Sequence, residues 1–148
     1  MKYLRGTSII EIVIATALIS VSVIAALSLT NHSQKQNTYA KSLAEATKYN
    51  NQATDWIRTQ RSLLGWTVMA SKPSGIYCLN TFPANFNNLP SLGSCAANSF
   101  ISGTIFQRQI TLDTSAQATG KIKITTAVIW LEKIARSATT EMELTSWH

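Results

Sequence analysis

The chain has 148 residues, and its 13 Lys and Arg against 7 Asp and Glu give a formal net charge of +6. This length accommodates one modest domain. The basic residues are scattered along the chain, whereas nucleic-acid-binding proteins typically cluster them among exposed aromatic residues. The composition therefore favours a small protein with a basic, solvated surface and only a weak preference for acidic partners.

An apolar run, IIEIVIATALISVSVIAALSL, occupies residues 9–29. As an α-helix this run would span about 31 Å, which matches the roughly 30 Å hydrocarbon core of a bilayer. Its polar members are mostly Ser and Thr, whose hydroxyls can bond to carbonyl groups one turn back. Lys2 and Arg5 precede the run, so the positive-inside rule places the N-terminus in the cytoplasm and the following residues outside. We expect a single-pass membrane helix.

One acidic residue, Glu11, lies just inside the start of the apolar run. A charged side chain within a membrane helix costs on the order of 2.5 to 3.5 kcal/mol even on lenient insertion scales. Glu11 could reach the headgroups by snorkelling from the helix end. Alternatively, it has a partner or a task, and the residue alone leaves both interpretations open.

The residues before the run decide between these interpretations. A secretory signal peptide has its cleavage site after the apolar core. Here a short basic leader, MKYLRG, ends in Gly6 and is followed by Thr7, three further residues and Glu11. A leader, a glycine, four residues and a glutamate at the head of a hydrophobic helix resemble the type IV prepilin signature.

The resemblance implies a processing step and a role for Glu11. A prepilin peptidase would cut between Gly6 and Thr7 and methylate the new amino group of Thr7. Glu11 would become the fifth mature residue, where pilins carry the acid that pairs with a neighbouring subunit's N-terminal amine. Thr7 stands where major pilins usually have Phe, and Ser28 where many have a helix-kinking Pro. Both departures favour a minor pilin or a pseudopilin.

Beyond the membrane, residues 31–64 contain neither Pro nor Gly and are rich in good helix formers, so the helix is expected to continue to Gly65. An apolar stripe at helical spacing predicts the side that packs on a sheet. The stripe consists of Ala40, Leu43, Ala46, Ala53, Ile57 and Leu64, with Trp56 beside them.

A turn-rich region follows at residues 65–102, with a short strand possible at 76–79. It contains Cys78 and Cys95, for which a disulfide is the natural expectation if the head leaves the cytosol. Two free buried thiols are the alternative. A disulfide closing a loop of this length would contribute about 3 kcal/mol in the chain-entropy model.

Three segments at residues 104–112, 121–131 and 138–147 show strand-like alternation. They predict an antiparallel meander on the second half of the helix, which is an α+β, pilin-like fold. The predicted organisation is a leader at 1–6, a transmembrane and assembly helix at 7–30 and its periplasmic continuation at 31–64. A globular head at 65–148 completes it, with loops at 65–102 and strands at 103–148.

The chain offers little for catalysis. Its two histidines are His32, after the apolar run, and His148, and no Gly-rich phosphate loop follows a strand. No His, Cys, Asp or Glu cluster has metal-ligand spacing. We therefore expect a non-enzymatic protein without a metal or cofactor.

These expectations describe a minor type IV pilin in the bacterial inner membrane, with its head in the periplasm or beyond. Its partners would be other pilins and the prepilin peptidase. A minor pseudopilin of a type II secretion system is the nearest alternative. A competence pilin that captures DNA through Arg108, Lys121, Lys123 and Lys133 is another, with nucleic acid the less favoured partner. An ordinary single-span membrane protein would keep residues 1–6.

Overall fold

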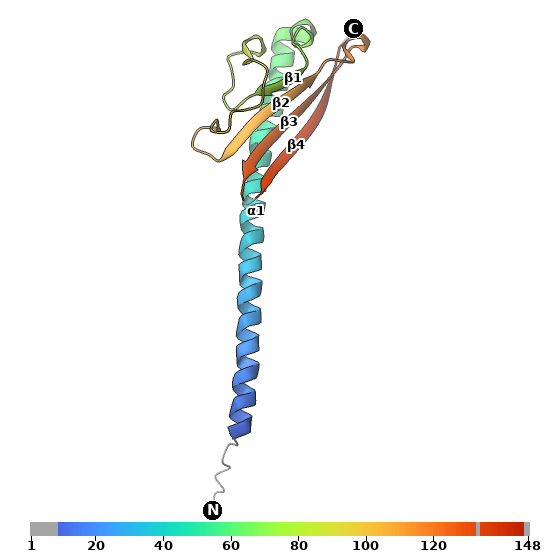
Figure 1. The fold of residues 1–148 in the computed structure, drawn as a ribbon. Helices are drawn as coiled ribbons and strands as arrows, with labels where there is room; N and C mark the ends of the chain where they lie inside the picture. The colour runs from blue at the N-terminus through green and yellow to red at the C-terminus, as the bar shows by residue number, and fades with distance from the viewer. Residues whose placement is uncertain (1–8, 133, 147–148) are drawn as a thin grey trace, which may run out of the picture. The chain divides into compact units, whose positions relative to one another are not determined.

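The structure, a computed structural model, describes residues 9–132 and 134–146. The chain divides into two units, Met1–Lys41 and Ser42–His148. Figure 1 shows one long helix and one antiparallel sheet, so the expected α+β class is confirmed. The elements are α1 (Ile9–Ala70), β1 (Gly75–Cys78), η1 (Phe86–Asn88), β2 (Phe106–Asp113), η2 (Gln117–Thr119), β3 (Lys121–Leu131) and β4 (Ala135–Thr145).

Helix α1 is interrupted at Gly65, whose φ of 77° and ψ of 178° are not helical. Glycine adopts this positive φ without the penalty that a Cβ would bring. The prediction that the helix stops here is therefore correct for the first stretch, but the prediction of a loop from residue 65 is wrong. The chain returns to helix up to Ala70, because Met69 and Ala70 are buried in the core.

The four strands form an antiparallel sheet in the order β1-β2-β3-β4. β3 has the predicted bounds, and the short strand suggested at 76–79 exists as β1. β2 starts two residues later than predicted, at Phe106, and β4 starts three residues earlier, at Ala135. The predicted end of the last strand at Trp147 lies outside the described residues.

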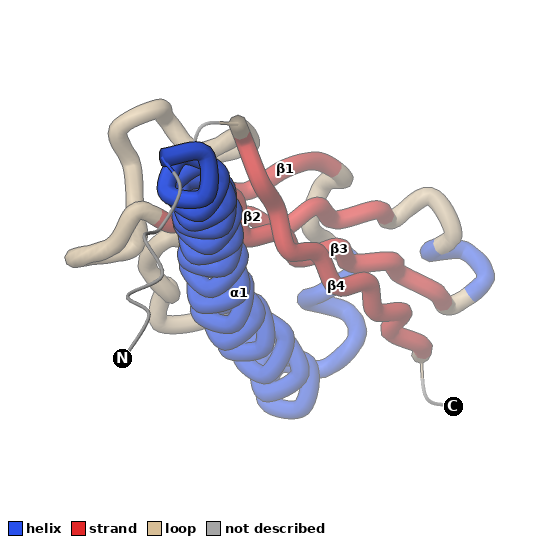
Figure 2. The backbone as a smooth tube through the Cα atoms, turned by 90° about the horizontal axis from the view of Figure 1, so that it is seen from below, coloured by secondary structure: helices blue, strands red, loops and turns tan. Residues whose placement is uncertain are grey.

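Within Ser42–His148, α1 packs along one face of this sheet, as Figure 2 shows from the end of the helix. The helix presents Ala46, Ala53 and Ile57, all fully buried, to the strands. Alanine at two of these positions allows close approach of helix and sheet. The predicted stripe is confirmed there, with Leu43, Trp56 and Leu64 partly buried at its borders and Ala40 exposed.

A buried polar cluster joins the same helix face to the two last strands. With its amide nitrogen turned toward Thr126, Asn50 donates to the Thr126 Oγ1 at 2.6 Å and accepts from the Thr140 Oγ1 at 2.8 Å. Asn50 and Thr126 are both buried, and a buried amide is costly unless its partners are present. This cluster therefore fixes the register between α1, β3 and β4.

Candidate functional site

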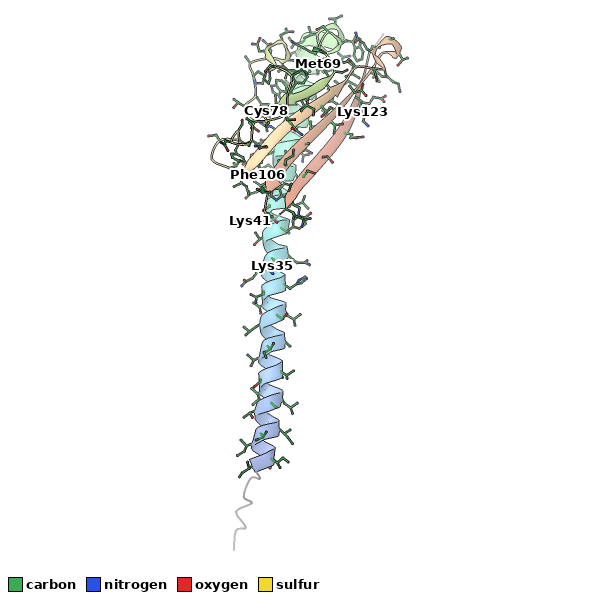
Figure 3. The ribbon with its side chains drawn as sticks, viewed as in Figure 1. Lys35, Lys41, Met69, Cys78, Phe106 and Lys123 are labelled. Atoms are coloured by element: carbon green, nitrogen blue, oxygen red, sulfur yellow. A yellow bond between two sulfur atoms is a disulfide. The ribbon has the colours of Figure 1, made fainter. Side chains whose placement is uncertain are left out.

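The first unit presents an apolar surface. Every described residue from Ile9 to Lys41 is exposed, including large side chains such as Ile9, Leu18 and Ile24. Figure 3 shows the side chains of this part of α1, up to the labelled Lys41, projecting from the helix. Among the described residues, α1 is the one helix long and apolar enough to cross a membrane, with a mean hydropathy of 2.6 in its most apolar window.

Four hydroxyl groups of this segment donate to carbonyl groups about one turn back in the helix, as the sequence predicted. Ser20 Oγ donates to the Thr16 carbonyl at 2.7 Å, and Ser22 Oγ donates to the Leu18 carbonyl at 2.8 Å. Thr16 and Thr30 make equivalent bonds. These side chains can therefore enter an apolar solvent without leaving a donor unpaired.

Glu11 differs from them. It is the single charged residue between residues 9 and 34, and it is exposed on α1. Among the residues that the structure describes, none makes an ion pair or hydrogen bond with its carboxylate. Gly6 and Thr7, the predicted cleavage and methylation positions, lie outside the described residues. Within the described residues, the structure thus shows Glu11 as an acid on an apolar helix surface.

The second unit contains the two cysteines, which form a disulfide as expected and are separated by 17 positions in the sequence. Cys78 is the last residue of β1, and Figure 3 labels it beside the sheet. The neighbouring Asn80 donates to the Ser99 carbonyl at 2.7 Å and accepts from the Arg108 backbone N–H. The disulfide and Asn80 together fasten the connection between β1 and β2 to the sheet.

Arg108 is the residue whose environment the sequence reasoning missed. The DNA-capturing alternative requires it on an exposed surface, but it is buried, with a relative exposure of 2%. Its Nε donates to the Leu79 carbonyl at 2.8 Å and its Nη1 to the Tyr49 carbonyl at 3.3 Å. Burial lowers the pKa of Arg108 to about 10. Its position between Phe106 and Ile110 on the buried side of β2 was the available signal, because alternate strand residues share one face.

The lysines of β3 are paired on the exposed face of the sheet. Lys121 Nζ lies 2.9 Å from Glu143, and Lys123 Nζ lies 2.8 Å from Glu141. The hydrogen bond and charge of Glu141 raise the pKa of Lys123. The side chain of Lys133 lies outside the described residues. The three described residues named for DNA capture, Arg108, Lys121 and Lys123, therefore do not form one free basic patch.

Within residues 9–132 and 134–146, no three His, Cys, Asp or Glu side chains come close enough to hold a metal ion. Comparison of the chain with protein-family models, with curated proteins and with solved structures gave no match. The features that remain for a functional argument are the apolar first unit with Glu11 and the disulfide-fastened second unit.

Proposed function

We propose that this chain is a minor subunit of a type IV pilin-like filament, anchored in the bacterial inner membrane by residues 9–29. The proposal places the second unit in the periplasm or beyond, in keeping with Lys2 and Arg5 before the span and the disulfide after it. A helix that packs on an antiparallel sheet through its second half supports the same class. The observation that carries it is the isolated Glu11 carboxylate on an exposed apolar helix.

The mechanism follows from the cost of that carboxylate. In lipid an unpaired charge is unfavourable by about 3 kcal/mol, so it gains by meeting a cation. At 4 Å and an effective dielectric of about 20, the attraction of two unit charges is about 4 kcal/mol. Leader cleavage after Gly6 would supply the cation as the α-amino group of Thr7 on a neighbouring subunit. The pairing would select incoming subunits and set their axial register.

Substitutions at Glu11 test the proposal. Glu11→Ala and Glu11→Gln both remove the charge, so each is expected to leave processed protein in the inner membrane and out of sheared filaments. Glu11→Asp keeps the charge on a shorter side chain and should retain part of the incorporation. Thr16→Ala, on the same apolar segment, is the matched control and should incorporate normally. Normal incorporation of Glu11→Gln would overturn the proposed mechanism.

The DNA-capturing alternative receives less support from the second unit. Arg108, which that alternative requires at the surface, is buried, and Lys121 and Lys123 form ion pairs with glutamates. Nucleic-acid affinity depends on cations that can release counterions from phosphates. A pseudopilin of a secretion system would share the assembly chemistry proposed for Glu11, and the genes next to this one would separate it from a pilus subunit.

A further inference from the structure

Exposed apolar residues gather at one end of the second unit. Leu131 is the last residue of β3, and Ile134 directly precedes β4. Ile105 directly precedes β2, whose first residue, Phe106, pairs with Trp130 of β3. The register of the strands therefore brings these apolar residues to the same end of the sheet. Their relative exposures are 70% for Leu131, 58% for Ile134 and 53% for Ile105.

The chain enters the second unit at this same end. Phe106, which Figure 3 labels, and Trp130 form a buried cluster with Ala46 of α1. Ser42 is the first residue of the second unit, and it lines a cavity of about 400 Å³ together with Ile105. The exposed apolar residues therefore lie where the chain arrives from residues 30–41.

The turn between β3 and β4 keeps its carboxylate hydrogen-bonded while it exposes its apolar side chains. Trp130 Nε1 donates to Glu132 Oε1 at 3.1 Å, and the Glu132 N–H donates to the Ile134 carbonyl at 3.3 Å. Leu131 and Ile134 flank this arrangement and are both exposed. The turn can therefore present its apolar side chains to an apolar phase without breaking the hydrogen bond of Glu132.

The length of the connection decides which apolar phase this end can meet. In the proposed anchoring, residues 9–29 lie in the bilayer, and residues 30–41 continue α1 to the second unit. Twelve helical residues rise about 18 Å, the headgroup layer is roughly 6 Å thick on each side, and membrane helices tilt by up to about 40°. Tilt brings groups on one side of the helix toward the headgroups. The bilayer surface is therefore within reach, and the connection makes the encounter intramolecular.

We propose that Ile105, Leu131 and Ile134 form a docking surface for the phospholipid bilayer and insert into its interfacial layer. The inference rests on the membrane anchoring in the proposed function, and it depends neither on filament assembly nor on Glu11. Binding at a membrane interface strengthens with the apolar area that is buried there. The contact therefore holds the second unit against the membrane for as long as the chain stays anchored.

The test uses the full chain reconstituted in phosphatidylcholine vesicles. An environment-sensitive fluorophore is attached to a cysteine introduced at Ser102, an exposed residue in the turn before Ile105, or at Ser62, an exposed residue of α1. Ser62 lies close to Leu64, which packs on the core cluster that contains Ile122, at the other end of the sheet. Lipids with a nitroxide near the headgroup end of the acyl chain should quench the label at residue 102 roughly threefold more strongly than the label at residue 62. Equal quenching at the two positions would overturn the inference.

Variants of exposed apolar residues provide the matched control. With the label at residue 102, Leu131→Ser combined with Ile134→Ser should lower the quenching by roughly half, because less apolar area enters the lipid. Leu63→Ser removes a leucine of similar exposure, 72%, and should leave the quenching unchanged. Unchanged quenching in the double variant, or an equal loss in Leu63→Ser, would overturn the inference.

Two further measurements separate this inference from the anchoring and from folding. The substituted side chains are exposed, so the melting temperatures of the variants should match that of the wild type. Flotation of the chain with the vesicles tests the anchoring by itself. A chain that floats but shows equal quenching at residues 62 and 102 contradicts the docking surface alone, whereas a chain that does not float contradicts the anchoring as well.

Discussion

The guanidinium carbon of Arg108 lies 3.8 Å from the centroid of the Phe82 ring. The same guanidinium donates to a carbonyl of α1, that of Tyr49, and to the Leu79 carbonyl just after β1. One buried cation thus connects the helix, the loop that follows β1 and strand β2. The carbonyl dipoles and the face of the Phe82 ring stabilise the charge of this buried guanidinium.

Replacing this guanidinium should destabilise the second unit. Arg108→Ala removes the donors to the Leu79 and Tyr49 carbonyls and empties the buried space of the side chain, for which we expect a loss of about 3 kcal/mol in the free energy of unfolding. Arg108→Lys keeps a charge but loses the planar fork, so it should recover only part of the loss. Thermal unfolding of the full chain in detergent measures both. A loss below about 0.5 kcal/mol for Arg108→Ala would contradict this role.

The close approach of helix and sheet gives a prediction at Ala53, which is fully buried. Ala53→Leu adds volume to a filled contact and should cost about 1 to 3 kcal/mol. Ala44→Leu makes the same change at an exposed position of α1 and should stay within about 0.5 kcal/mol. Equal melting temperatures for the two variants would show that the helix does not pack on the sheet at Ala53.

The disulfide should contribute measurably to the stability of the second unit. Replacing both Cys78 and Cys95 with Ala frees the loop between them, and the expected loss is about 3 kcal/mol. A reductant should lower the melting temperature of the wild type to about that of the double variant, and it should leave the melting temperature of the double variant unchanged. If the reductant lowered both melting temperatures equally, the effect would not come from this bond.

Asp113 gives the acid-pH prediction. The Ser115 backbone N–H donates to its carboxylate at 2.9 Å and holds the pKa of Asp113 below its ordinary value. The folded state therefore favours the charged form. Its contribution is fully present above the ordinary Asp pKa of about 3.9 and is lost as the pH falls through the lower folded pKa. Asp113→Asn should remove this component from the melting temperature measured between pH 5 and pH 2.

A carboxylate titration by NMR isolates the cause of the shift. Ser115→Ala removes the hydroxyl but keeps the backbone N–H, which is the larger of the two influences of Ser115. The pKa of Asp113 should therefore stay below its ordinary value in this variant. Ser115→Pro removes the N–H and should return the pKa toward that value. An unchanged pKa in Ser115→Pro would contradict the assignment.

The strength of each local pattern explains which elements could be predicted from the sequence. Ile122 and Ile124 share one face of a strand-like run, which indicated β3, and in the structure its more and less buried residues follow a period of two from Ile122 to Trp130. β4 begins at Ala135, where exposed residues carry no such pattern and pairing with Leu131 decides the boundary. The helical turn after Gly65 forms because tertiary burial of Met69 outweighs the local stop signal.

Some features of the candidate site could be predicted from the sequence and others could not. The apolar segment, Glu11 and the cysteine pair could be named from residue type and spacing alone. The burial of Arg108 could be inferred from its place in the alternation of β2, but its carbonyl partners at Tyr49 and Leu79 could not, because they come from distant parts of the chain. The place of β4 at the edge of the sheet depends on the order of the strands, which the alternation within a single strand does not contain.

The central claim is that a free amino group at Thr7 becomes available to the Glu11 carboxylate of an adjoining subunit. Intact-mass measurement of the full chain extracted from its native membrane tests this claim most directly. We predict a polypeptide that starts at Thr7, with or without one added methyl group. A membrane-extracted chain that still begins at Met1 would leave Glu11 without that partner and would contradict the account.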